Sequence, residues 1–224
     1  MTFSIVARCT KTGQFGMAVA SSSPAVAARC AYARAGIGAV ASQNVTDPRL
    51  GPAALDQLAA GLDASAALDA VIDANDHVEY RQLLIVDREG NTAIHSGRKS
   101  LGIHTEYATH DAAAAGNLLA NENIPRAMIE AFLTAEGHLG DRLVKAMRGA
   151  LTAGGEAGPV HSAGMLLVDK QDWPLVELRS DWSEDCPVEN VASAWNVYRP
   201  QMDDYVTRAL NPSAAPSYGV PGDK

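Results

Sequence analysis

The sequence predicts an α+β protein with a four-layer αββα sandwich, in which two mainly antiparallel sheets stack between outer layers of helices. Three pairs of short strands, each joined by a polar turn, alternate along the chain with pairs of amphipathic helices, and such turns join antiparallel neighbours. The strands at 83–86 and 165–168 are apolar on both faces, so they need cover on both sides. A three-layer α/β/α arrangement is the alternative, but it requires more parallel crossovers than these turns supply.

The first part of the chain predicts a hairpin, a further strand and two helices. Apolar runs at 3–9 and 15–21 are separated by a polar connection that contains glycine, which is typical of a tight reversal. The run at 36–43 predicts another strand, and its glycines indicate close approach of a second backbone. Leucines on one face of 50–62 predict a helix, and Asp63 is placed to cap the helix that follows.

The middle of the chain predicts a second hairpin and a second helix pair. Segments 82–87 and 92–96 flank a loop with turn-forming residues, and the stretch at 107–119 is less regular. A proline at position 125 and apolar residues spaced four apart predict helices over 123–135 and 139–151.

The last part predicts a third hairpin, a terminal helix and an arm. The hairpin is expected at 162–169 and 174–178, and the helix over 189–210 is interrupted or restarted at Pro200. The tail 212–224 is rich in Pro, Gly and Ser, which is typical of a flexible C-terminal arm. Because composition does not change before the tail, 1–211 is expected to form one domain. The apolar terminal helix and the arm favour a homo-oligomer.

Composition argues against several classes of function. The net charge of −8, with Lys and Arg spread singly, leaves no basic stripe for nucleic acid. No apolar stretch approaches the roughly 20 residues that span a bilayer, and no leader pattern is present, so we expect a cytoplasmic protein without membrane association. Three scattered cysteines suit reduced thiols. The histidine spacings give no metal signature and no cofactor motif occurs, so we expect neither metal nor cofactor.

The start of the chain carries a possible catalytic unit. Met1 precedes the small residue Thr2, and a methionine in this context is commonly removed. Its removal would leave a hydroxyl and a free α-amine on one residue. An α-amine titrates at about pH 8 and is a suitable base for a hydroxyl nucleophile. The alternative is an ordinary strand residue, because many proteins begin with Met-Thr.

Six motifs follow one another along the chain: TFSIVAR at 2–8, GMAVAS at 16–21, AGIGAVASQ at 35–43, YRQ at 80–82, GNLLA at 116–120 and RPQMD at 199–203. In this order they resemble a bacterial family called domain of unknown function 1028 (DUF1028). The resemblance implies membership of the N-terminal-nucleophile (Ntn) hydrolase superfamily, whose fold is the four-layer sandwich and whose members often cleave amide bonds. It implies no particular substrate.

One region departs from the pattern of that family. Where the resemblance leads us to expect Gly-Gly-Asp, an arginine and then Gln-Ser-Ala, this chain has Glu156 for the acid, Gly158 for the arginine and His161 for the glutamine. We place Glu156 and Ser162 of this region among the substrate-binding residues. Without the arginine, the subsite is expected to prefer a neutral or cationic substrate group over an anion.

The remaining candidates match positions of that family, and side-chain chemistry suggests a role for each. Thr2 stands at the nucleophile position, and Ser21 is placed to orient its amine. Gln43 and Asn117 carry amide donors for an oxyanion, although lone amides are more often structural. Arg81, beside Gln82, is placed to bind a substrate carboxylate, and the competing interpretation is a buried ion pair of Arg81 with Asp87 or Glu79.

Two functions follow from these residues. The first is an Ntn amidohydrolase that acts on a small amide or peptide, with Thr2 as nucleophile and its own amine as base. The second is a catalytically silent protein of the same fold that binds a small ligand or serves as an assembly subunit.

Overall fold

Two antiparallel sheets form the centre of the computed structural model, which describes residues 1–220. The larger sheet has six strands in the order β10-β9-β2-β1-β8-β7, and the smaller has four in the order β3-β4-β5-β6. In chain order the strands are β1 (Thr2–Arg8), β2 (Phe15–Ser21), β3 (Ala31–Arg34), β4 (Gly38–Asn44), β5 (Arg81–Asp87), β6 (Thr92–Ser96), β7 (Thr105–Thr109), β8 (Ala112–Asn117), β9 (Ser162–Val168) and β10 (Val176–Ser180).

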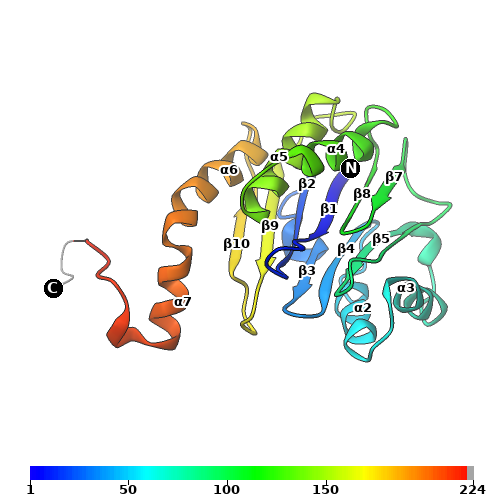
Figure 1. Ribbon diagram of the computed structural model, residues 1–224. Helices are drawn as coiled ribbons and strands as arrows, with labels where there is room; N and C mark the ends of the chain where they lie inside the picture. Colours follow the sequence, from blue (N-terminus) through cyan, green and yellow to red (C-terminus); the bar gives the residue numbers. More distant parts are fainter. Residues whose placement is uncertain (221–224) are drawn as a thin grey trace.

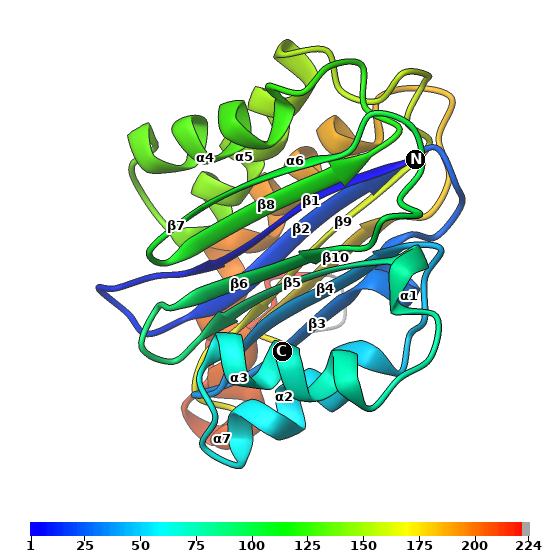
Figure 2. The ribbon, with the colours of Figure 1, turned by 90° about the vertical axis from the view of Figure 1, so that its right-hand side faces the viewer.

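Helices cover the outer face of each sheet, so the predicted four-layer sandwich is confirmed (Figures 1 and 2). Helices α4, α5 and α6 lie on the larger sheet, and α2 and α3 lie on the smaller one. The helices are α1 (Ala27–Cys30), α2 (Leu50–Ala59), α3 (Ala64–Asp73), α4 (Ile124–Thr134), α5 (Leu139–Thr152), α6 (Pro187–Tyr198) and α7 (Met202–Leu210), with short 3-10 turns at Val78–Tyr80, Arg199–Gln201 and Pro212–Ala214.

Three apolar clusters fill the three interfaces between the layers. Phe3 and Ile5 pack with residues of α4 and α5 under the larger sheet. Val6 belongs to the cluster between the two sheets. A third cluster joins the smaller sheet to α2 and α3. Because side chains alternate along a strand, Thr2 and Ser4 share the face of Val6 and lie between the sheets.

Several local predictions are confirmed in detail. Asp63 caps α3 by accepting a hydrogen bond from the Ala66 amide. The interruption at Pro200 divides the terminal helix into α6 and α7, because proline has no N–H to continue the helical ladder. Helix α7 projects away from the sheets (Figure 1). Of the predicted arm, 212–220 begins with a 3-10 turn, and 221–224 lies outside the described residues.

Four elements were not predicted. The short helix α1 and the edge strand β3 lie in a segment for which the sequence predicts no element, and the stretch at 107–119 contains most of the β7–β8 hairpin. Strand β8 is a run of small residues whose alanines lack the bulky side chains that mark a strand. Within residues 1–220, no helix is both long and apolar enough to cross a bilayer.

Candidate active site

Thr2 begins an inner strand of the larger sheet and is buried between the two sheets. It pairs with Asn117 of β8, and only 6% of the residue is exposed. The Thr2 hydroxyl lies 3.3 Å from Ser21 Oγ, and both hydroxyls donate to the carbonyl oxygen of Met1. Two hydroxyls from neighbouring strands therefore meet at the carbonyl group of the residue that precedes Thr2.

Antiparallel pairing explains why these residues meet. The start of β1 lies between the end of β2 and the end of β8, so Ser21 and Asn117 flank Thr2 from either side. On the smaller sheet, the end of β4 lies beside the start of β5 and pairs Gln43 with Gln82. Each of these five residues lies an even number of positions from residues of the inter-sheet cluster in its own strand, so it shares the face of that cluster. They therefore form a polar end to an otherwise apolar layer.

Gln43 is fully engaged in hydrogen bonds inside this layer. Its Oε1 accepts from Ser4 Oγ at 2.6 Å. Its Nε2 donates to Gln82 Oε1 at 2.7 Å and to the Ala115 carbonyl at 3.2 Å. Both amide hydrogens of Gln43 are therefore used in contacts within the protein.

Gln82 continues the same network to the larger sheet. Its Nε2 donates to Ser96 Oγ at 2.9 Å and to the Gly116 carbonyl at 3.2 Å. Its Oε1 also accepts from Asn117 Nδ2 at 3.3 Å. Gln82 thus ties the smaller sheet to Asn117, the strand neighbour of Thr2.

A chain of hydroxyl groups connects Thr2 to a cation that the sequence analysis did not identify. Ser21 Oγ lies 2.8 Å from Ser23 Oγ, and Arg29 Nη2 donates to Ser23 Oγ at 2.6 Å. The Arg29 guanidinium is held by the carbonyl groups of Pro24 and Ala25. The signal in the sequence was a run of three serines followed by an arginine, but the turn that joins them cannot be read from spacing.

Arg81 is not brought to Thr2. Residues 83 and 85 of β5 belong to the cluster under α2 and α3, so Arg81 faces the same way, opposite to Gln82. Its guanidinium donates to the Val45 carbonyl. Neither expected ion pair forms among the described residues, because Glu79 pairs with Arg98 at 2.9 Å and Asp87 accepts hydrogen bonds from backbone and Asn91 donors.

Glu156 lies in a loop that covers the amino terminus. It forms an isolated antiparallel bridge with Leu119, and its Oε2 accepts from the Ser22 amide at 3.1 Å. Burial raises the pKa of the Glu156 carboxyl to about 7, against the opposing effects of the positively charged amino terminus and the Ser22 hydrogen bonds. A Cβ on Gly158 would stand 3.2 Å from Met1 Cε, so this loop contacts Met1 as well.

Ser162 and His161 support the turn beside this loop. Ser162 Oγ donates to the Ser23 carbonyl at 2.6 Å and accepts from the Val26 amide at 3.1 Å. The His161 ring stacks on Trp182 with 4.3 Å between ring centroids. Ser162 thus holds the backbone that carries Ser23.

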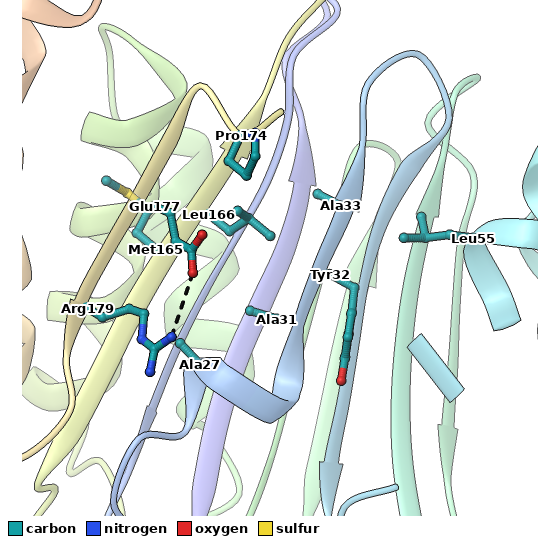
Figure 3. Close-up of a pocket in the computed structure, with 10 residues that line it drawn as sticks. All are labelled: Ala27, Ala31, Tyr32, Ala33, Leu55, Met165, Leu166, Pro174, Glu177 and Arg179. Atoms are coloured by element: carbon teal, nitrogen blue, oxygen red, sulfur yellow. Dashed lines mark ion pairs between the residues drawn. The ribbon is translucent and has the colours of Figure 1, made fainter. Parts of the chain in front are cut away.

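A separate cavity opens where the smaller sheet ends and the larger sheet continues (Figure 3). It encloses about 250 Å³ between β3 and the β9–β10 edge, and a loose ion pair of Glu177 and Arg179, 3.8 Å apart, lies at its border. Its lining is mostly alanine and aliphatic and does not include Thr2. Among residues 1–220, no group of three or more His, Cys, Asp or Glu side chains could hold a metal ion.

Comparisons with known proteins identify relatives of this chain. The sequence profile described as "Family of unknown function (DUF1028)" matches residues 2–191. The crystal structure of protein SPO2555 from Silicibacter pomeroyi, assigned to DUF1028, is 29% identical, covers 88% of each chain and superposes with a TM-score of 0.82.

More distant structures include two forms of Anbu. The Gly-1 mutant of Anbu from Hyphomicrobium sp. strain MC1 is 11% identical over 92% of this chain and 99% of its own, with a TM-score of 0.45. Anbu (ancestral beta-subunit) from Yersinia bercovieri is 11% identical over 90% and 96%, with a TM-score of 0.40. A search of curated proteins found no match.

Proposed function

We propose that this protein, which belongs to the DUF1028 family, is an Ntn amidohydrolase that cleaves a small amide or peptide bond with Thr2 as its nucleophile. The main support for this proposal is one observation. The hydroxyl groups of Thr2 and Ser21 converge on the carbonyl of Met1, so an acyl carbonyl fits beside the nucleophile. After removal of Met1, the carbonyl of a substrate would occupy the same place.

The reaction proceeds in two stages in this proposal. The α-amine of Thr2 takes the hydroxyl proton while Oγ1 bonds to the substrate carbonyl carbon. The ammonium then returns the proton to the leaving nitrogen as the C–N bond breaks, which leaves an ester on Oγ1. Water attacks the ester, its proton passes through the amine to Oγ1, and the acid is released.

The neighbouring residues divide into two groups in this proposal. Ser21 Oγ and the second amide hydrogen of Asn117 donate to the developing oxyanion, an interaction worth about 2.7–4 kcal/mol per donor. Gln43 and Gln82 hold Asn117 in place, because their own amide hydrogens are used within the protein. Arg29, acting through Ser23, places a positive charge at the end of the hydroxyl chain.

The substrate is proposed to be a small molecule with a neutral or cationic group near Glu156. That carboxyl is buried beside Met1, and a second negative charge placed there would be repelled. We also propose that the protein is a homo-oligomer, because α6, α7 and the arm expose Val197, Leu210 and Val220.

The second candidate is a silent protein of the same fold that binds a ligand or serves as an assembly subunit. One observation favours it. In the chain that retains Met1, the Thr2 nitrogen is an amide, which cannot act as a base, and the Thr2 hydroxyl is occupied by the Met1 carbonyl.

Two preparations of the full chain test the proposal. One begins at Thr2, released from a cleavable leader and verified by intact mass, and the other retains Met1. Both are incubated with a library of small amides and ureides, and released ammonia or amine is measured. We expect turnover only from the Thr2 preparation, retained in Thr2→Ser and lost in Thr2→Ala. Equal turnover by Thr2→Ala would refute the nucleophile, and no turnover across a broad library would favour the silent protein.

A further inference from the structure

Glu156 bridges the two strands that flank Thr2. Strand β1 runs between β2 and β8, and its first residue stands beside the last residues of both. Glu156 contacts Ser22, which follows β2, and Leu119, which lies just beyond β8. Its backbone therefore pairs beyond β8 while its carboxyl contacts the segment after β2, close enough to the amino terminus to interact with its charge.

One oxygen of this carboxyl has no partner. Glu156 is 5% exposed, and while Oε2 accepts from the Ser22 amide, Oε1 is buried with no hydrogen bond from any described residue. A buried carboxylate oxygen without a donor is costly. A donor supplied at that place would satisfy it.

Removal of Met1 turns the Thr2 nitrogen, which is an amide in the chain that retains Met1, into a free α-amine at this end of the sheet. The amino terminus of the chain with Met1 already interacts electrostatically with Glu156. Among the described residues, the other titratable or charged groups at this end include the buried Cys30 thiol, the Arg29 guanidinium of α1 and the exposed carboxyl of Glu184. His161 ends the same loop, but it stacks on Trp182 with Nδ1 bonded to the Ser183 carbonyl. Glu156 is thus the acid placed to receive the amine.

We propose that Glu156 is a positioning residue whose Oε1 accepts a hydrogen bond from the α-amine of Thr2 and aims the nitrogen lone pair at Oγ1. The inference rests on the proposed function and adds nucleophile orientation to the expected role of Glu156 at the substrate subsite. The neutral amine has two hydrogens and one lone pair. A hydrogen fixed on Oε1 restricts rotation about the N–Cα bond, so the lone pair stays on the side of the hydroxyl proton.

The test measures the amine itself and needs no substrate. In full-length protein that begins at Thr2, N-terminal acylation by limiting acetic anhydride is followed across pH by the mass of the N-terminal peptide, which gives the titration midpoint of the amine. A nearby carboxylate favours the ammonium form, so Glu156→Gln is expected to lower the midpoint by about one pH unit or more. Glu184→Gln, at an exposed acid of the same end of the molecule, is the control and is expected to leave it unchanged.

Three outcomes decide the inference. A midpoint lowered in Glu156→Gln, and lowered less in the shorter Glu156→Asp, supports it. An unchanged midpoint in both variants, or an equal change in Glu184→Gln, overturns it. If Glu156→Gln does not fold, Glu156→Asp decides alone, because an unchanged midpoint there also overturns the contact. If Glu156→Gln lowers the titration midpoint of the amine but the protein has no turnover, only the proposed function is refuted. If the midpoint is unchanged in an active enzyme, only this inference is refuted.

Discussion

Replacing Gln82 with leucine tests whether the buried amides form the support for the candidate site. Leucine is close to glutamine in size but has no polar atoms. The change leaves one N–H of Gln43, one N–H of Asn117 and the Gly116 carbonyl without their side-chain bonds. Ser96 keeps a bond to Glu106 at 2.5 Å, so it adds little to the loss.

The expected loss follows from these three groups. Each buried polar group left without a partner costs about 1–3 kcal/mol, and the better burial of leucine returns about 1–2 kcal/mol. We therefore expect Gln82→Leu to lower the free energy of unfolding by about 4 kcal/mol. For a chain of this length that corresponds to a fall in Tm of about 8–16 °C.

The assay is urea denaturation, which measures the free energy of unfolding of Gln82→Leu, with Gln14→Leu as the matched control. Gln14 is also buried, but its Nε2 makes one long bond of 3.5 Å to Asp169 and its Oε1 has no partner among the described residues. The control is expected to lose less than about 1 kcal/mol. A similar loss in both variants, or a loss below about 1 kcal/mol in Gln82→Leu, would refute the reasoning that the network is tightly satisfied.

Three further predictions concern the groups around Thr2. In the protein that retains Met1, the raised pKa of Glu156 means that the folded state binds an extra proton between about pH 4.5 and 7, so the free energy of unfolding falls as pH rises through that range. Glu156→Gln is expected to reduce this fall by about 2 kcal/mol, as measured by urea denaturation at pH 5 and pH 8. Parallel pH profiles of the two proteins would contradict the prediction. In an active preparation, Arg29→Gln is expected to lower kcat about tenfold by removing the charged donor to Ser23, with partial recovery in Arg29→Lys; unchanged kcat would exclude a role for that chain of hydroxyls. Gly158→Arg is expected to raise kcat/KM for carboxylate over matched carboxamide substrates by about tenfold or more, and an unchanged ratio would place the anion subsite elsewhere.

Much of the fold could be predicted because its signals are local. The composition of two loops, the polar connection after β1 and the loop between β5 and β6, is enough to predict their hairpins. Asp63 caps α3 with its own side chain, which accepts a hydrogen bond from a residue only three positions further along the chain. Such a local contact can be predicted from sequence spacing. The layer order then follows, because strands that are apolar on both faces must be covered twice.

The unpredicted parts depend on contacts between distant segments. Strand β8 consists largely of alanine and glycine, which fit where Leu119 and the backbone of Thr2 crowd against Gly116. Nothing local distinguishes such a strand from a loop. Arg29 was missed for a similar reason, since only the turn after β2 brings it to Ser23.

The site residues were predicted unevenly for a physical reason. Strand alternation separates Gln82 from Arg81 by face, but it does not say which face meets the other sheet. Leu83 packs under α2 and α3 while Leu84 packs between the sheets, and this places Gln82 near Asn117 and directs Arg81 away. Once a single contact of this kind is known, the faces of all neighbouring positions follow.

Two of the described non-glycine residues with left-handed backbone angles lie at the same end of the sandwich. Ala25 and Leu118 adopt left-handed backbone angles, with φ of 49° and 52°, a conformation that costs a residue with a side chain about 1–2 kcal/mol. Ala25 shapes the turn that presents Ser23 and Arg29, and the Leu118 carbonyl accepts from the Ala157 amide at 2.9 Å, which fixes the loop of Glu156. Strain opposes stability, and polar groups can be buried here only because the network satisfies their hydrogen bonds; the inter-sheet cluster of the same layer is apolar instead. Strained residues and buried polar networks often accompany functional sites, so their presence around Thr2 supports the proposal that this end of the sandwich is the working site.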